Sequence, residues 1–238
     1  MHTSTRVTRP DRFYLWFAIV LSLIVVSGFA RTYYLKFLFG TPSLPWLLHF
    51  HGLIMTAWVT LFLTQVSLVS ANRIDLHRRL GFAGAILAFF IVAVGTVAAI
   101  RMARRDVLAF PGSDYPLSFL ALQLIGLLFV FAVLVTSALL LRHRPDYHRR
   151  LMLLAFLRLL PPAVTRIPLT IVQKGGIPLI VGVDVFAVIA LILLDCIKHR
   201  RLHPALAWGG LLLAGSDFAV IYFSQTSAWL HFAKWLVY

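Results

Sequence analysis

Long apolar runs alternate with short polar linkers along this chain. The apolar runs cover about residues 13–30, 47–70, 80–101, 117–141, 149–172, 178–197 and 205–226. Each run is close to the roughly 20 residues that an α-helix needs to cross the hydrocarbon core of a bilayer. The pattern therefore predicts an all-α integral membrane bundle of about seven transmembrane helices.

The linkers are too short to hold a soluble domain, so residues 1–238 are interpreted as a single transmembrane domain with a short tail at 1–12. Breakers such as Pro42, Pro45, Pro111 and the Gly175-Gly176 pair separate the runs. The first run is longer than the roughly 7–15 residues of a signal-peptide core. It is expected to be an uncleaved first helix.

The composition agrees with residence in a membrane. The chain is 61% hydrophobic and only 13% charged, whereas soluble domains carry roughly 25% charged residues. The formal net charge of +14 raises the possibility of a nucleic-acid partner. That class is disfavoured because the basic residues cluster at the ends of apolar runs, which is typical of a membrane protein facing anionic lipids.

One basic motif occurs twice. The sequence R-I-D-L-H-R-R-L at 73–80 returns as R-P-D-Y-H-R-R-L at 144–151, and a shorter K-H-R-R-L stands at 198–202. Recurrence at equivalent places predicts a tandem repeat that relates helices two and three to helices four and five. Asp75 and Asp146 are expected to cap the helices that follow.

The basic residues also predict the orientation. Thirteen Lys and Arg residues fall on the side of the tail and the three basic loops, and seven fall on the opposite side. Because cytoplasmic loops are enriched in Lys and Arg, we expect a bacterial inner-membrane protein with a cytoplasmic N-terminus and a periplasmic C-terminus.

Three histidines are candidate cofactor ligands. His77 and His148 begin helices three and five on one membrane side and are able to face each other as axial imidazoles, or as part of a metal or quinone site. Lipid contact is the simpler reading of the motif around them. His51 belongs to a polar face of helix two that packs helices together or faces a cavity.

Four ionisable residues fall within predicted spans, where charge is costly. Their depths pair Arg158 with Asp217 and Arg166 with Asp184. Pro161 and Pro162 lie between the two arginines and are expected to kink helix five. The pairs either lock helices together or line a cavity for protons, quinone or an anionic substrate. We expect the main polar cavity between helices two, five and seven.

Several segments suggest a family. H-R-R-L-M-L-L-A at 148–155, H-F-H-G at 49–52 and L-H-R-R-L-G at 76–81 resemble a widespread group of uncharacterised bacterial inner-membrane proteins over roughly residues 13–170. H-R-R-L-M is also similar to membrane proteins implicated in assembling haem-copper oxidases. The histidines resemble those of two-haem membrane cytochromes b, although helix four lacks a histidine to match helix two.

Three functions follow from these features. The first is a redox-linked membrane protein that binds haem b or quinone, or assists an oxidase, through His77, His148 and His51. The second is a proton or small-solute transporter that uses the Arg and Asp residues. The third is an accessory subunit of a larger membrane complex. Cys196 is the single cysteine, so no thiolate metal site is expected. Motifs of hydrolases and nucleotide enzymes are also lacking.

Overall fold

The computed structural model describes residues 13–238, apart from the side chains of Ile171 and Gln173, and the tail predicted at 1–12 lies outside the described residues. Every regular element in the described part is helical. The elements are α1 (Phe13–Phe29), η1 (Ala30–Tyr34), η2 (Lys36–Leu38), α2 (Trp46–Ser70), α3 (Ile74–Ala109), α4 (Tyr115–Ala121), η3 (Leu122–Phe129), α5 (Val130–Leu140), α6 (Pro145–Arg158), α7 (Pro161–Val164), α8 (Thr170–His199), α9 (Pro204–Phe223) and α10 (Ser227–Val237).

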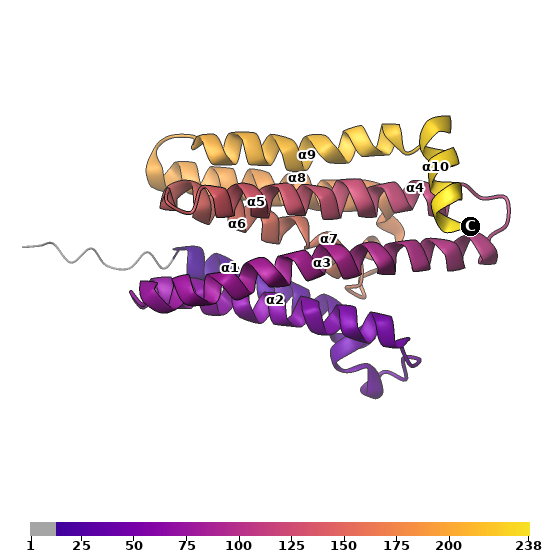
Figure 1. Ribbon diagram of the computed structural model, residues 1–238, viewed down its shortest axis with the longest axis horizontal. Coiled ribbons are helices and arrows are strands. Elements are labelled where there is room, and N and C mark those ends of the chain that lie inside the picture. Colours follow the sequence, from indigo (N-terminus) through magenta and orange to yellow (C-terminus); the bar gives the residue numbers. More distant parts are fainter. Residues whose placement is uncertain (1–12) are drawn as a thin grey trace, which may run out of the picture.

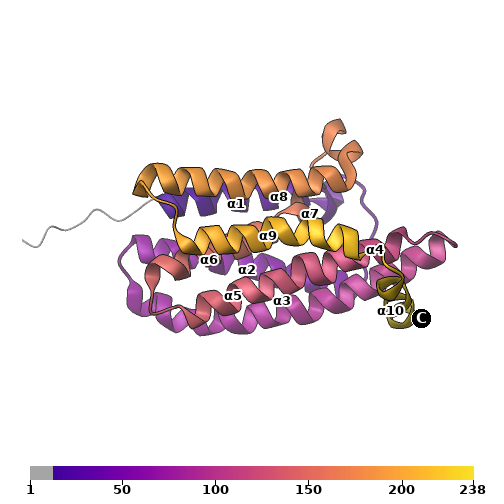
Figure 2. The same cartoon turned by 90° about the horizontal axis from the view of Figure 1, so that it is seen from above.

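The long helices run side by side in one bundle (Figures 1 and 2). Six helical segments in the described part are long and apolar enough to cross a membrane: 13–34, 46–70, 74–109, 115–140, 174–199 and 204–223. The fifth predicted span, at 149–172, is absent from this set. The fold class is confirmed, and the protein is a multi-pass membrane protein.

The predicted helix at 149–172 is wrong in its extent. α6 ends at Arg158, and Pro161 and Pro162 then form only the four-residue helix α7. A proline lacks the N–H group and its ring clashes with the preceding turn, so the helix does not continue through this pair. A 14-residue helix is about 21 Å long, and α6 therefore stops part of the way through the bundle.

The two copies of the basic motif occupy the same place in the fold. Each copy begins the second helix of an antiparallel pair, α2 with α3 and α5 with α6. The expected caps are wrong, because neither helix start has a side-chain cap. Asp146 instead forms ion pairs with Arg149 and Arg150. Its carboxylate holds the arginines of its own helix in place.

The helix predicted at 205–226 ends at Phe223, and the short helix α10 follows it. Thr226 caps α10 by accepting a hydrogen bond from the backbone N–H of Trp229. The Trp229 indole donates to the Leu117 carbonyl over 2.9 Å. α10 therefore lies across the end of the bundle, against α4 (Figure 1).

The broken segment after α6 packs directly on α1. A Cβ atom built on Gly28 would lie 2.1 Å from the Ala163 carbonyl oxygen, far inside van der Waals contact. Glycine is therefore required where α1 crosses α7, since any side chain would push the two backbones apart. This contact fixes the place where the chain leaves α6.

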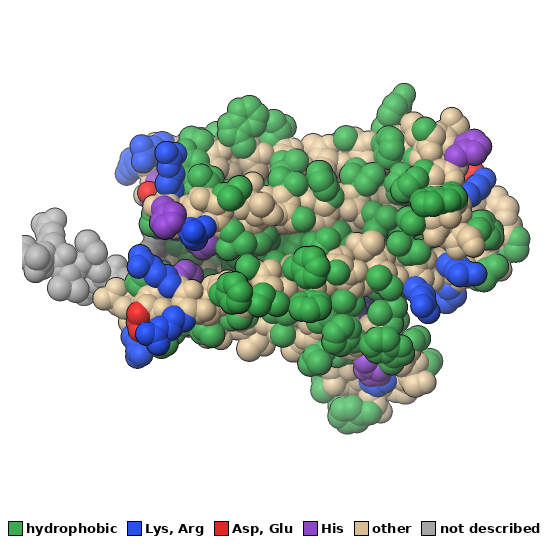
Figure 3. All heavy atoms as spheres, in the orientation of Figure 1, with side chains coloured by type: hydrophobic (Ala, Val, Ile, Leu, Met, Phe, Trp, Pro, Cys, Tyr) green, Lys and Arg blue, Asp and Glu red, His purple; other side chains and the backbone are tan. Residues whose placement is uncertain are grey.

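The outside of the bundle is apolar along its length. Figure 3 shows hydrophobic side chains over the middle of one face, with Lys and Arg gathered toward the two ends. Exposed aromatic residues include Phe82, Phe89, Phe186 and Trp208, each at least 68% accessible. An apolar belt of this kind fits a lipid bilayer.

Candidate functional site

An ionic triad lies at the inner end of α6. One nitrogen of Arg158, Nη1, is 2.6 Å from Asp184 Oδ2 on α8 and 2.6 Å from Asp217 Oδ1 on α9. All three side chains are buried, with at most 4% of any side chain accessible. The triad therefore joins three helices through a single guanidinium in the interior of the bundle.

The helix ending positions the guanidinium. Arg158 is the last residue of α6, and the C-terminal end of a helix carries partial negative charge that favours a cation. The neighbouring span is π-helical at 122–129 and presents Gly126 to Arg158. A Cβ atom on Gly126 would lie 3.0 Å from Arg158 Nη2. π-helical turns are frequent at functional sites, and this one makes room for the arginine.

The charges in the triad do not balance. Two carboxylates share one guanidinium, which leaves one negative charge when both acids are ionised. Arg158 Nε, Asp184 Oδ1 and Asp217 Oδ2 are buried and have no hydrogen-bond partner among the described residues. An uncompensated buried charge is costly. The triad is therefore suited to holding one proton or another small cation.

A second buried cluster lies between the triad and one end of the bundle. This end, called the basic end from here on, carries the starts of α3, α6 and α9 and the end of α8. Arg150 forms a forked contact with Asp195, with Nε 3.0 Å from Oδ2 and Nη2 2.9 Å from Oδ1. Tyr14 donates a hydrogen bond to Asp195 Oδ1 over 3.0 Å.

The cluster around Asp195 also includes a residue that is partly accessible to solvent, His199. His199 Nδ1 lies 3.3 Å from Asp195 Oδ1, and about a quarter of the His199 side chain is accessible. Asp195 itself is fully buried. Asp184 and Asp195 are 11 residues apart on α8, which is close to three turns, so they share one face about 16 Å apart. Two clusters of ionisable groups thus lie on one side of α8, and the buried apolar residues Val188 and Leu191 separate them.

The predicted pairs of charges are partly correct. Arg158 does contact Asp217, but the pairing of Arg166 with Asp184 is wrong, because Asp184 bonds Arg158 instead. The pairing failed because Arg166 follows the break after α6 and does not continue that helix. The helix that carries Asp184 begins after a kink at Gly176, close to its expected start. Arg166 donates to the Pro162 carbonyl over 2.6 Å and lies over the Phe29 ring.

Two of the three candidate histidines, His77 and His148, lie side by side, as the repeated motif led us to expect. The rings of His77 and His148 have centroids 6.1 Å apart and are nearly perpendicular, at 81°. His51 is not near them, because it lies in the second turn of α2, which begins at the opposite end of the bundle. Nineteen residues of α2 separate it from the basic end, a distance of about 28 Å. The structure therefore brings together His77 and His148 and excludes His51 from their site.

The histidine pair fits some requirements of axial haem ligands. His148 Nδ1 is 2.8 Å from the Ala138 carbonyl oxygen. A carbonyl only accepts, so Nδ1 carries the proton and Nε2 is left free as a ligand, the usual arrangement for a metal-binding histidine. His77 Nδ1 is buried without a partner among the described residues. The pair supplies two imidazoles on facing helices, the number that a haem b iron takes.

A polar cavity lies at the basic end. It was expected between helices two, five and seven, which correspond to α2, α6 and α9. It lies instead between the starts of α6 and α9, and α2 contributes nothing to its lining. The expectation placed the cavity deep in the bundle because it assumed that α6 crosses the membrane.

Sequence reasoning missed the cluster around Asp195. Arg150 was read with the other motif arginines as a lipid contact, yet only 2% of its side chain is accessible. Tyr14, Asp195 and His199 were not selected at all. The helical spacing of Asp184 and Asp195 was the signal that pointed to them.

Comparisons with protein-family models, with curated proteins and with solved structures found no match to this chain.

Proposed function

We propose that this chain is a proton-coupled transporter of the bacterial cytoplasmic membrane, with Arg158, Asp184 and Asp217 as the proton-binding centre. The observation that carries the proposal is the single buried guanidinium between two carboxylates. Intramembrane acids of this kind mark proton and ion paths in pumps and transporters. The substrate would be a small solute that couples to the bound proton.

The second cluster supports a path for that proton. Asp195 and His199 lie on the α8 face that carries Asp184, toward the basic end. On this path, water would carry the proton past the apolar residues Val188 and Leu191. A discontinuous helix that ends at a charged site in the bundle is also typical of secondary transporters. α6 has this form, since it ends at Arg158.

The proposed orientation places the N-terminus in the cytoplasm and the C-terminus in the periplasm. The excess of Lys and Arg at the basic end supports it. A reporter that is active only in the periplasm, fused to the C-terminus, should be active, whereas a fusion within 143–147 should be inactive. The reverse pattern would refute the orientation.

The central test is infrared spectroscopy of the purified protein in lipid. A carboxylic acid that holds the triad's proton gives a carbonyl band that ionised carboxylates lack. We expect this band to diminish in Asp184→Asn and Asp217→Asn and to persist in Asp114→Asn. Asp114 is the matched control because it lies at the surface, 3.5 Å from Lys234.

Proton movement is measured next in liposomes loaded with a pH-sensitive dye. An imposed membrane potential should drive proton uptake with wild type and fail to do so with Asp217→Asn. The proposal would be refuted if the wild-type spectrum lacked the carboxylic acid band and if wild type, Asp184→Asn and Asp217→Asn all gave the same proton flux. The Asp114→Asn control guards against a general effect of removing an acid.

The facing imidazoles favour a second candidate, a redox protein that binds haem b or quinone at His77 and His148. The supporting observation is the ring separation of 6.1 Å together with the proton position on His148. Protein made with ample haem should show a Soret absorption band that His77→Ala or His148→Ala removes. A colourless, folded preparation would reject the haem form of this candidate.

A further inference from the structure

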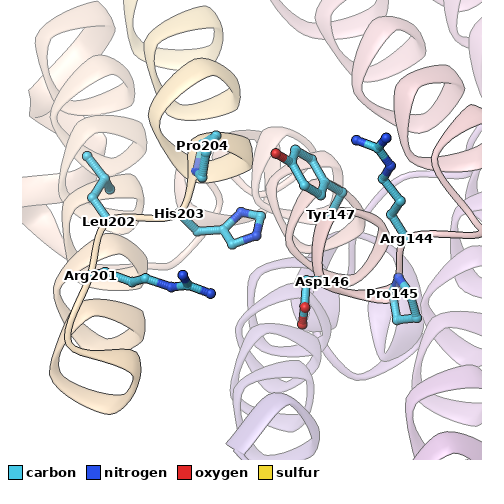
Figure 4. Close-up of a pocket in the computed structure, with 8 residues that line it drawn as sticks. All are labelled: Arg144, Pro145, Asp146, Tyr147, Arg201, Leu202, His203 and Pro204. Carbon is cyan, nitrogen blue, oxygen red and sulfur yellow. The ribbon is translucent and has the colours of Figure 1, made fainter.

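The cavity at the basic end has the size of a small-ligand site. Its volume is about 630 Å³, within the range of roughly 300–1,000 Å³ for such sites. It opens between the loop before α6 and the loop before α9 (Figure 4). Its lining consists of Arg144, Pro145, Asp146, Tyr147, Arg201, Leu202, His203 and Pro204.

His203 presents a hydrogen-bond donor at this cavity. Its side chain is buried, with 8% accessible, and its ring is directed toward the start of α6 (Figure 4). His203 Nδ1 accepts a hydrogen bond from the Ala205 N–H over 3.2 Å. The neutral ring therefore carries its proton on Nε2, and no acceptor for that proton is found among the described residues.

The charges around the cavity favour an anion. Arg144 and Arg201 are both exposed on its rim. Asp146 also lines it, but this carboxylate already pairs with Arg149 and lies 3.7 Å from Arg150 Nη1. The single acid is thus compensated from outside the cavity, and the rim arginines keep their charge for a ligand.

Two helix starts add to the positive electrostatic potential at the cavity. α6 begins at Pro145 and α9 begins at Pro204, and both residues line the cavity. The N-terminal end of a helix carries partial positive charge. Two such ends converge here on the same space as His203 and the rim arginines.

We propose that this cavity binds a phosphate group, presented by a lipid headgroup or by a small phosphorylated solute. Arginine suits this ligand because its planar guanidinium donates two parallel hydrogen bonds to phosphate oxygens. The His203 Nε2–H group supplies a further donor. The position of the cavity also suits a phosphate ligand, because the cavity lies at the end of the apolar belt, at the level of lipid headgroups.

The first experiment measures binding of inorganic phosphate to the detergent-solubilised protein by calorimetry, with sodium chloride at matched ionic strength as the blank. Losing one charged hydrogen bond should weaken binding about tenfold. We expect this loss in Arg201→Gln and in His203→Asn, which keeps an acceptor for the helix cap. Arg79→Gln is the control, since Arg79 is exposed at the same end but outside the cavity.

The second experiment separates the two sources of phosphate. Wild type and Arg201→Gln are placed in nanodiscs of phosphatidylglycerol or of a neutral glycolipid, and retained lipid is measured by native mass spectrometry. Phosphatidylglycerol retained by wild type alone identifies a headgroup site. Binding of inorganic phosphate without retained lipid identifies a solute site. The proposal would be overturned if wild type bound neither inorganic phosphate nor phosphatidylglycerol. It would also be overturned if wild type and Arg201→Gln bound them equally.

Discussion

Arg158 and Asp184 are joined by a 2.6 Å contact between Nη1 and Oδ2, although 26 residues separate them and they belong to helices that enter the bundle from opposite ends. The contact exists because α6 stops at Arg158 and α8 carries Asp184 to the same level. A continuous helix through 149–172 would have placed Arg158 within a helix instead of at a C-terminal end, where the partial negative charge favours a cation. The break in α6 is thus part of the site.

Removing the triad's acids should affect stability unequally. Asp184→Asn or Asp217→Asn alone leaves one carboxylate with Arg158, so each should change the free energy of unfolding by about 1 kcal/mol. The double variant strands a guanidinium that stays charged in proteins and should lose about 3–5 kcal/mol. Thermal unfolding in detergent measures both. Strictly additive losses would contradict the shared contact.

The Asp195 cluster should show a graded response. Asp195→Asn removes the charge that Arg150 contacts through two nitrogens, and we expect a loss of about 3–5 kcal/mol in unfolding free energy. Tyr14→Phe removes one hydrogen bond to a charged group, worth about 1.5–3 kcal/mol. Asp75→Asn, at an exposed residue, is the control and should leave the unfolding temperature unchanged.

The crossing of α1 and α7 predicts the effect of a single methyl group. Gly28→Ala would place Cβ 2.1 Å from the Ala163 carbonyl oxygen, so the two backbones must separate and stability should fall by about 1–3 kcal/mol. Gly182→Ala is the matched control, because open space surrounds its Cβ position. That change should be neutral or slightly stabilising, since alanine favours helix. Equal behaviour of the two variants would argue against the close crossing.

His203 should make stability depend on pH. Burial lowers the pKa of its imidazole below the ordinary value, and the nearby Arg150 guanidinium lowers it further. The unfolded chain therefore binds a proton more readily than the folded one, and stability should fall as pH drops below about 6.5. The unfolding temperature of His203→Asn, measured from pH 8 to pH 5, should decline less steeply than that of wild type. Parallel curves would show that His203 does not contribute.

The helical bundle was predictable because bilayer thickness sets a fixed length for each apolar run. The ends of the helices were not. The apolar residues after Arg158 continue the run through 159–164, so hydropathy alone extends α6 past its true end. The prolines indicated a kink, but the chain breaks fully there because α7 is held against α1 at Gly28. That contact involves residues far apart in sequence.

The candidate site was predictable only for residues whose partners could be found from their depth along the predicted helices. Arg158 and Asp217 lie at matching distances along their predicted helices, and the pair forms. Asp184 was assigned to the wrong arginine because the chain breaks between Arg158 and Arg166, so Arg166 does not lie two turns further along the same helix. Arg150 was hidden within a motif whose other arginines lie at the surface, since charge alone does not tell a buried guanidinium from an exposed one.

The short α6 also constrains how the protein is made. Its two buried arginines, Arg150 and Arg158, leave the ribosome before the buried acids that they contact, because Asp184, Asp195 and Asp217 all lie later in the chain. An arginine at the centre of an inserting helix costs about 2.5–3.5 kcal/mol on insertion scales, and α6 carries two buried ones. A nascent chain that ends near residue 169 contains four segments able to span the membrane, and we expect its α6 to stay at the membrane surface. We therefore expect α6 to enter the bilayer only after α8 and α9 have been made and supply the acids that pair with its arginines.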